Sequence, residues 1–86
     1  MIKIHARIIK NQKTLKSVTY QNVNEYESKN FYFYLTEICR RLEISAPIVI
    51  AHSRENYEDF NFVKFSKDDF VDSINFDYLL LENIDR

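Results

Sequence analysis

The amino-acid sequence predicts an α+β fold. An N-terminal β-hairpin, one main helix, two short helical segments and a C-terminal strand are expected to form a small antiparallel or mixed sheet packed on the main helix. Near the N-terminus, apolar and polar residues alternate, as in a strand with one wet face. In the middle of the chain, apolar residues recur at helical spacing instead. A chain of 86 residues has room for one core, so a single domain over residues 1–86 is expected.

The first part of the chain predicts the hairpin. The run IKIHARIIK at residues 2–10 alternates, and TLKSVTYQNV at residues 14–23 is rich in β-branched residues, which favours a second strand. The chain contains no glycine, and Gln12 occupies the place where glycine is usual in a tight turn. A slightly longer or strained turn is therefore predicted. The apolar phase of the second strand slips between Leu15 and Val18, which predicts a bulge.

The main helix is predicted near residues 27–43, where the period of the apolar residues changes. Ser28 is the predicted N-cap, and Arg40 and Arg41 fall in the last turn, where cations are favoured. The apolar stripe of this helix consists of Phe31, Leu35, Ile38 and Leu42.

Two shorter helical segments are predicted after Pro47. The proline pushes the residue before it toward extended geometry, and a helix near residues 53–60 follows, with Ser53 as its cap. NFVKF is typical of an extended segment. In SKDDFVDSI, Ser66 is predicted to cap a second short helix. The side chains expected to turn inward from it are Phe70, Val71 and Ile74.

The closing strand lies in NFDYLLLENI. Residues 78–81 are all apolar, so both faces of this strand are expected to be covered, and it is predicted to pair with the first strand in a three-stranded sheet. In this arrangement Leu79 and Leu81 face outward. The predicted core sets the stripe of the main helix against Ile2, Ile4, Ile8 and Leu80.

Composition limits the class of protein. The chain is 45% hydrophobic and 15% aromatic, which indicates a globular rather than a disordered protein. Cys39 is the only cysteine, so no internal disulfide is possible, which suits a reducing cytosol. No apolar run approaches the roughly 20 residues of a membrane span, and charges interrupt the N-terminal apolar stretch, unlike a signal peptide. A cytoplasmic protein that does not associate with membranes is expected.

Residues 43–60 hold the strongest candidate for a catalytic cluster, because Ser53 and Glu55 lie beside His52. Adjacent side chains usually diverge, and no third group is placed to orient a nucleophile. His5 and His52 come from distant segments without the spacing of a metal site, and phosphate-binding loops need glycine. We therefore predict no enzyme activity, no metal and no cofactor, and interpret the region as a joint between helices.

Charge is distributed unevenly along the chain. Residues 1–20 carry five lysines and arginines and no acid, whereas residues 55–86 carry nine acids against three bases. A basic two-stranded ribbon can enter a major groove or follow phosphates, so nucleic-acid binding is the alternative function. Against it, the whole chain has a net charge of −1, and Tyr20 is the only aromatic residue in the basic region. The candidate residues are Lys3, His5, Arg7, Lys10, Lys13 and Lys16.

Apolar residues that do not all fit on the inward face of a small sheet predict the main function. Exposed apolar surface of this kind marks binding or self-association. The sequence therefore predicts a small protein–protein interaction or accessory protein, whose partner is another protein or a second copy of the chain. The candidate partner-binding residues are Ile9, Leu15, Leu79 and Leu81.

Three stretches also carry a resemblance: EICRRLEISAPIVI, the phenylalanines at positions 60 and 65, and DDFVDSINFDYLLLE. They resemble a small family of uncharacterised, conserved bacterial proteins of clostridia and related Firmicutes, whose members have about this length and open with a similar basic hairpin. The resemblance covers most of the chain and implies a source and an architecture but no activity. The chain departs from the family pattern at Gln12, where glycine is usual, and in IVIAHS, which lacks a large aromatic residue after the proline.

Overall fold

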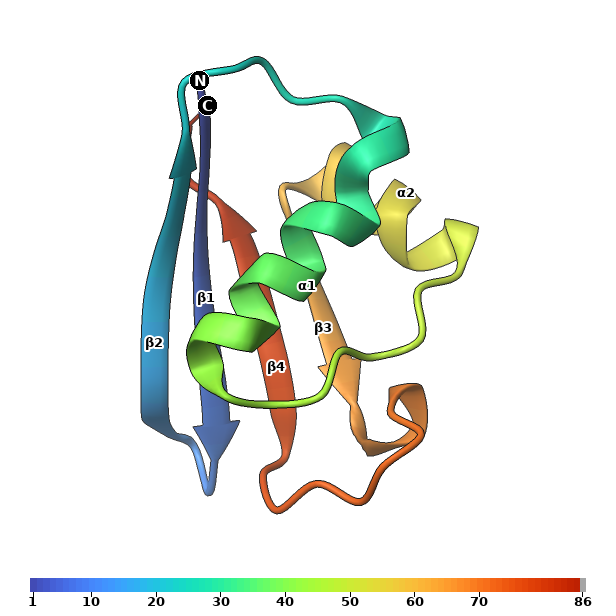
Figure 1. Cartoon of the computed structure of the whole chain (residues 1–86). Coiled ribbons are helices and arrows are strands. Elements are labelled where there is room, and N and C mark those ends of the chain that lie inside the picture. The colour runs from blue at the N-terminus through green and yellow to red at the C-terminus, as the bar shows by residue number, and fades with distance from the viewer. Residues whose placement is uncertain (86) are drawn as a thin grey trace.

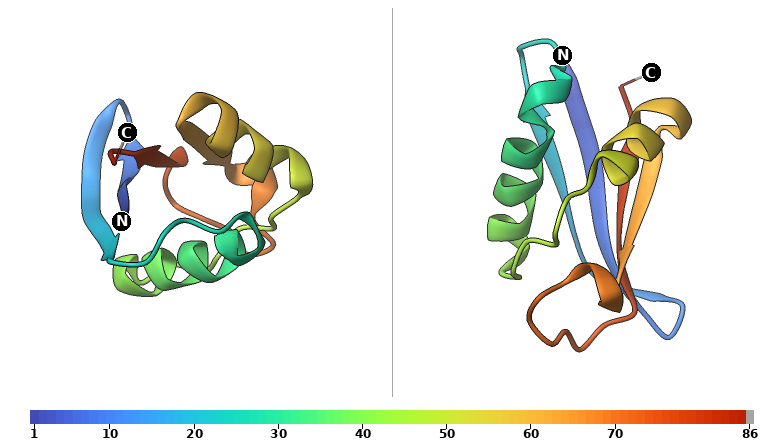
Figure 2. Two further views of the ribbon diagram at one scale, coloured as in Figure 1. Left: turned by 90° about the horizontal axis from the view of Figure 1, so that it is seen from above. Right: turned by 90° about the vertical axis from the view of Figure 1, so that its right-hand side faces the viewer.

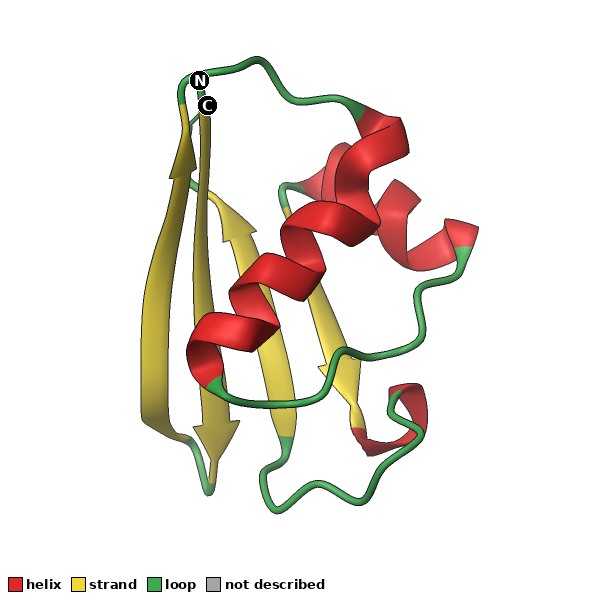
Figure 3. Cartoon of the chain, in the orientation of Figure 1, coloured by secondary structure: helices red, strands yellow, loops and turns green. Residues whose placement is uncertain are grey.

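A computed structural model describes residues 1–85 of the chain and confirms the predicted α+β class. The chain forms one antiparallel sheet, two α-helices and two single 3-10 turns, η1 and η2. Figure 1 and Figure 3 show α1 lying across the sheet. The elements in chain order are β1 (Ile2–Lys10), β2 (Lys13–Asn22), η1 (Ser28–Asn30), α1 (Phe31–Leu42), α2 (Ala51–Phe60), β3 (Phe62–Ser66), η2 (Lys67–Asp69) and β4 (Tyr78–Asn83).

The sheet has four strands in the order β2-β1-β4-β3, all antiparallel. The predicted pairing of the closing strand with the first is confirmed, with Ala6 opposite Leu81. The expected three-stranded sheet is wrong, because NFVKF is not a separate cover but the fourth strand. It pairs with β4 along the whole of its five-residue length, so β4 is a central strand and both of its edges are paired, with β1 and with β3.

The hairpin turn contains two residues, Asn11 and Gln12, at φ values of 52° and 65°. Of the two predicted alternatives, the longer turn is wrong and the strained turn is confirmed, because Gln12 occupies the left-handed region that usually selects glycine. The predicted bulge is present at Leu15: Ile8 lies opposite Lys16 and Ile9 opposite Thr14, which leaves Leu15 without a partner.

Two of the three predicted helix caps are wrong. Ser28 begins η1 rather than α1, whose N-cap is Asn30, and Ser53 lies inside α2, which begins two residues earlier. Ser66 is confirmed as a cap: its backbone N–H donates to the Asp69 carboxylate at 2.8 Å, in a capping box. The helix it caps is a single turn, so residues 70–77 form a loop.

The core lies between the sheet and α1, and the predicted stripe of α1 is buried in it. Cys39 lies there too, and burial raises the pKa of its thiol to about 12, so the reactive thiolate is absent at neutral pH. The inward residues Phe70 and Ile74 pack as predicted, whereas Val71 is 82% exposed, contrary to prediction.

The phase of β4 is opposite to the prediction. Leu79 and Leu81 are fully buried in the core, whereas Leu80 is half-buried on the other face. Because successive side chains of a strand point to opposite faces, an error of one residue exchanges the two sets.

Candidate interaction surfaces

One face of the sheet, called the open face below, is not covered by the core cluster. On β1, alternate residues from Ile2 to Ile8 enter the core, so the residues between them point to the opposite face. Figure 2 shows α1 against one side of the sheet and no helix against the other side of β1 and β2. The open face is lined by Lys3, His5, Arg7, Phe62, Lys64, Tyr78, Leu80 and Glu82.

Three of the four charged side chains on the open face contact a partner. The Arg7 Nη2 donates to Glu82 Oε1 at 2.7 Å, and both side chains are about one third exposed. The Lys64 Nζ lies 4.8 Å from the centre of the Tyr78 ring, which is the geometry of a cation–π contact. Lys3, Arg7 and Lys64 outnumber Glu82, so the open face carries an excess of positive charge around half-buried apolar side chains.

The structure divides the six residues predicted to bind nucleic acid. Lys3, His5 and Arg7 lie together on the open face, and Lys10 and Lys13 flank the hairpin turn. Lys16 is separated from them, because it points to the helix side of the sheet. Its Nζ donates to the Leu42 carbonyl at 3.2 Å, at the C-terminus of α1, where the helix dipole favours a cation.

The four residues predicted to bind a partner do not form one surface. Leu79 and Leu81 belong to the core, so their expected outward orientation is wrong. Ile9 follows Ile8 on the other face of β1 but is only 6% exposed, and it is paired with Thr14 and Tyr78. Leu15 alone is exposed, at the bulge, beside a groove on the helix side.

Two exposed phenylalanines were missed by sequence reasoning. Phe60 ends α2 and is 63% exposed, and Phe62 begins β3 and is 46% exposed. Together with Asn56, Val63 and Lys64 they line a groove of about 290 Å³ between the helix and the strand. The available signal was the alternation in NFVKF: if Val63 and Phe65 point inward, Phe62 must point out.

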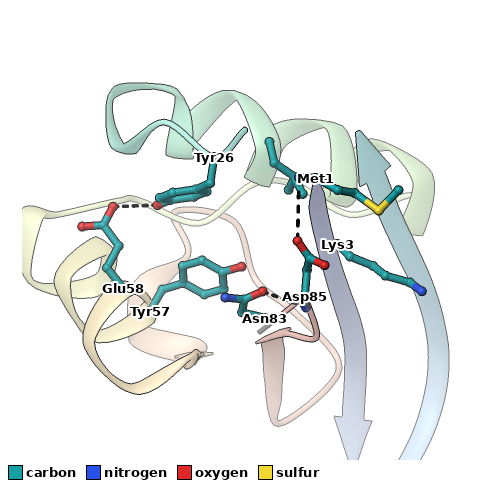
Figure 4. A pocket seen from close by; sticks show the side chains of 8 residues that line it. Met1, Lys3, Tyr26, Tyr57, Glu58, Asn83 and Asp85 are labelled. Carbon is teal, nitrogen blue, oxygen red and sulfur yellow. Dashed lines mark hydrogen bonds and ion pairs between the residues drawn. The ribbon is translucent and has the colours of Figure 1, made fainter. Parts of the chain in front are cut away.

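A second hollow lies where the two ends of the sequence meet. Figure 4 shows it between the ring of Tyr26, the ring of Tyr57 and the start of the chain. Its volume is about 210 Å³. The Tyr26 hydroxyl donates to the Glu58 carboxylate at 2.7 Å. The remaining lining residues are Met1, Ile2, Lys3, Asn83 and Asp85.

Ionisation in this hollow follows from burial and that hydrogen bond. Burial and the neighbouring Glu58 raise the pKa of both Tyr26 and Tyr57, so the two phenols stay protonated. For Glu58, burial opposes ionisation, but hydrogen bonds from Ser28 and Tyr26 outweigh it and lower the pKa of the carboxyl. The hollow thus offers two protonated phenols, one of them hydrogen-bonded to Glu58, and the carboxylates of Glu58 and Asp85.

The His52 region lies on α2. His52 and Glu55 are exposed and Ser53 is half-buried, and the helix they share begins after an extended linker that contains Pro47. Within residues 1–85, no three His, Cys, Asp or Glu side chains gather closely enough to hold a metal ion.

The chain was also compared with known proteins: no family model, no curated protein and no solved structure matches it. The resemblance to the clostridial family therefore stays a prediction. None of the helices in residues 1–85 is long and apolar enough to cross a membrane.

Proposed function

We propose that this chain is a small cytoplasmic accessory protein that acts by binding another protein through the open face of its sheet, and not by catalysis. One observation supports the proposal above all: Phe62, Tyr78 and Leu80 share a face with fixed charges while the core occupies the other face. Aromatic side chains and arginine, with charges in paired arrangements, are typical of protein interfaces.

The charge of the open face defines the partner's chemistry. Lys3 and Lys64 form no ion pair with a carboxylate among residues 1–85, whereas Arg7 is neutralised by Glu82. A partner that presents acidic side chains around an apolar centre would match both features. Electrostatic complementarity of this kind raises the rate of association and selects among partners.

Nucleic-acid binding is the second candidate, and one observation favours it. Phe62 and Tyr78 lie on the same face of the sheet as the basic side chains of β1. Aromatic rings that could stack on nucleobases are therefore next to lysine, histidine and arginine side chains. A sheet with this combination can stack bases and attract phosphates. Glu82 in the centre of the face and the net charge of −1 weigh against it.

The experiment is an affinity pull-down from the native host, with and without nuclease, using wild type and two matched variants. Leu80→Glu introduces a negative charge on the open face, and Leu15→Glu introduces the same charge at an exposed leucine on the helix side. Circular dichroism first establishes that both variants are folded.

The proposal predicts a defined protein partner that survives nuclease, is retained by Leu15→Glu and is lost by Leu80→Glu. Retention by Leu80→Glu and loss by Leu15→Glu would move the binding site to the helix side and refute the open face. A signal abolished by nuclease would support the nucleic-acid candidate instead.

A further inference from the structure

The outer edge of the sheet at β3 presents main-chain groups without partners in the sheet. In an antiparallel pair, residues alternate between those that exchange both hydrogen bonds with the partner strand and those whose N–H and C=O point away. The Asn83 N–H donates to the Asn61 carbonyl at 2.8 Å, which fixes Asn61 as a bonded position. By alternation Val63 and Phe65 are bonded to β4, and Phe62 and Lys64 direct their main-chain groups outward.

Ser66 confirms this alternation of hydrogen bonds along β3. Ser66 is predicted by the same alternation to point its N–H away from β4, and that N–H donates instead to the Asp69 carboxylate. The lower end of the edge is thus closed by η2. Phe62 and Lys64 remain as an open stretch between η2 and α2, and Figure 2 shows this edge of the sheet facing the viewer in its right-hand panel.

The side chains beside this stretch specify what fits it. The groove of about 290 Å³ lies between Phe60 of α2 and Phe62 of β3, and both rings are exposed, so it suits a bulky apolar side chain. Lys64 is the only charged residue of β3, and its ammonium group contacts the Tyr78 ring rather than a carboxylate. An acidic side chain next to it would complete an ion pair.

The opposite edge of the sheet is protected in ways that β3 is not. β2 has a bulge at Leu15, whereas the pairing of β3 with β4 is regular, and bulges are one device by which proteins prevent strand addition. Lysine is another, and β2 carries Lys13 and Lys16 where β3 has Lys64 alone. No exposed aromatic side chain lies within β2, whose one aromatic residue, Tyr20, is buried.

We propose that the edge of β3 binds an extended segment of the partner protein as an added strand, with an apolar side chain between Phe60 and Phe62 and an acidic side chain beside Lys64. This inference rests on the proposed function and specifies how part of the partner docks next to the open face. Main-chain hydrogen bonds supply affinity in such complexes, and the pockets for alternate side chains supply specificity.

The probe is a library of random peptides of about eight residues, long enough to pair with β3, displayed on phage and selected on the immobilised full chain. Enriched peptides are synthesised with a fluorescent label, and their affinity is measured by anisotropy. The proposal predicts enrichment of sequences in which apolar and acidic residues recur at even spacing, because side chains on one face of a strand are two residues apart.

Two matched comparisons test the added strand. N-methylation of alternate peptide amides removes every donor that faces β3 in one series and every donor that faces solvent in the other. The first series should lose binding by at least about tenfold and the second should retain it. Lys64→Pro, which removes the outward N–H of an edge strand, should abolish binding, whereas Lys64→Ala should weaken acidic peptides only about two- to fivefold.

The outcomes separate this inference from the proposed function. Equal effects of the two methylation series, or peptides that bind Lys64→Pro as they bind wild type, would overturn the added strand. Failure to enrich any peptide would overturn it as well. In each of these cases the pull-down partner that depends on Leu80 would still stand, because the open face does not require a strand at the edge. The methylated peptides are measured on the wild-type protein. If the Lys64→Pro variant does not fold, the two methylation series still test the added strand.

Discussion

The two faces of β4 differ more than its sequence indicates. Leu80 and Leu81 are identical neighbours, yet Leu81 is 1% exposed in the core and Leu80 is half-buried on the open face among Arg7, Lys64 and Glu82. The covered face is closed by α1 and by Tyr57 of α2, whereas the open face has only neighbouring side chains as cover. A leucine therefore stabilises the core on one face of β4, and a leucine on the other face is available to contact a partner.

This difference explains why exposed leucines alone are a poor guide to a binding surface. The open face presents its apolar groups beside the Arg7–Glu82 pair, in which each charge has a partner. A partner that covers it would bury apolar area without leaving these two charges unpaired, and acidic side chains of the partner would pair with Lys3 and Lys64, which is the condition for a favourable interface.

The largest expected effect on stability comes from replacing Leu81 and Leu80, one at a time, with alanine. Leu81→Ala should lower the free energy of unfolding by about 2–5 kcal/mol, because it opens a cavity in the core. Leu80→Ala should lower it by less than about 1 kcal/mol, because neighbours and solvent can fill the space. Urea denaturation of both variants measures the difference. Equal losses would mean that the two faces are not distinct in energy.

The fold followed from sequence where a pattern was long and local. The hairpin alternates over nine residues, and the stripe of α1 repeats over three turns, so each period is unambiguous. The capping box at Ser66 was recognisable for the same reason: it depends on Asp69 three residues later and on nothing distant.

The phase of β4 did not follow because the run Tyr78–Leu81 is apolar throughout. The usable signal was Glu82, which lies on the same face as Leu80 and would have placed that face toward solvent. NFVKF was predicted as extended but not as a fourth strand of the sheet. β3 is only five residues long, and its pairing with β4 depends on tertiary contacts that a short local pattern does not specify. The alternation in NFVKF indicates that Phe62 is exposed, but the groove between Phe60 and Phe62 depends on the position of β3 beside α2, which the sequence alone does not predict.

The second expected effect concerns buried phenols on the covered side. The pKa of Tyr57 is raised by burial and by Glu58, so unfolding releases its proton once the pH exceeds the unfolded value of about 10. Because the unfolded state then binds fewer protons, this one tyrosine lowers stability as the pH rises, by about 1 kcal/mol at pH 11. Tyr57→Phe removes this loss while keeping the ring. Tyr26 and Cys39, whose pKa values are also raised, add to the loss in every variant.

Denaturation curves at pH 7, 9 and 11 measure that loss. Tyr32→Phe is the matched control, since Tyr32 is 54% exposed on α1. Wild type and the control should lose stability in parallel above pH 9, and Tyr57→Phe should lose less. Parallel curves for all three proteins would show that the phenol of Tyr57 reaches solvent in the folded state.

A third pair of variants compares two serines that the sequence predicts as helix caps. Ser66→Ala removes the hydroxyl half of the capping box and should cost about 1 kcal/mol, whereas Ser53→Ala, inside α2, should cost less than about 0.5 kcal/mol. Thermal melts followed by circular dichroism are sufficient to rank them. The opposite ranking would restore Ser53 as the cap of α2 and shift the start of that helix by two residues.

The smallest expected effect belongs to the open face itself. Arg7 and Glu82 are joined at 2.7 Å but remain about one third exposed, so water and salt screen the pair. A double-mutant cycle with Arg7→Ala and Glu82→Ala should give a coupling of about 0.2–1 kcal/mol that decreases as salt is added. A coupling near zero at low salt would mean that the pair does not order the face. A coupling well above 1 kcal/mol that is insensitive to salt would mean that the pair is desolvated like the core. In that case the open face would not be exposed to solvent at Arg7 and Glu82, and the two faces of the sheet would not differ in the way described.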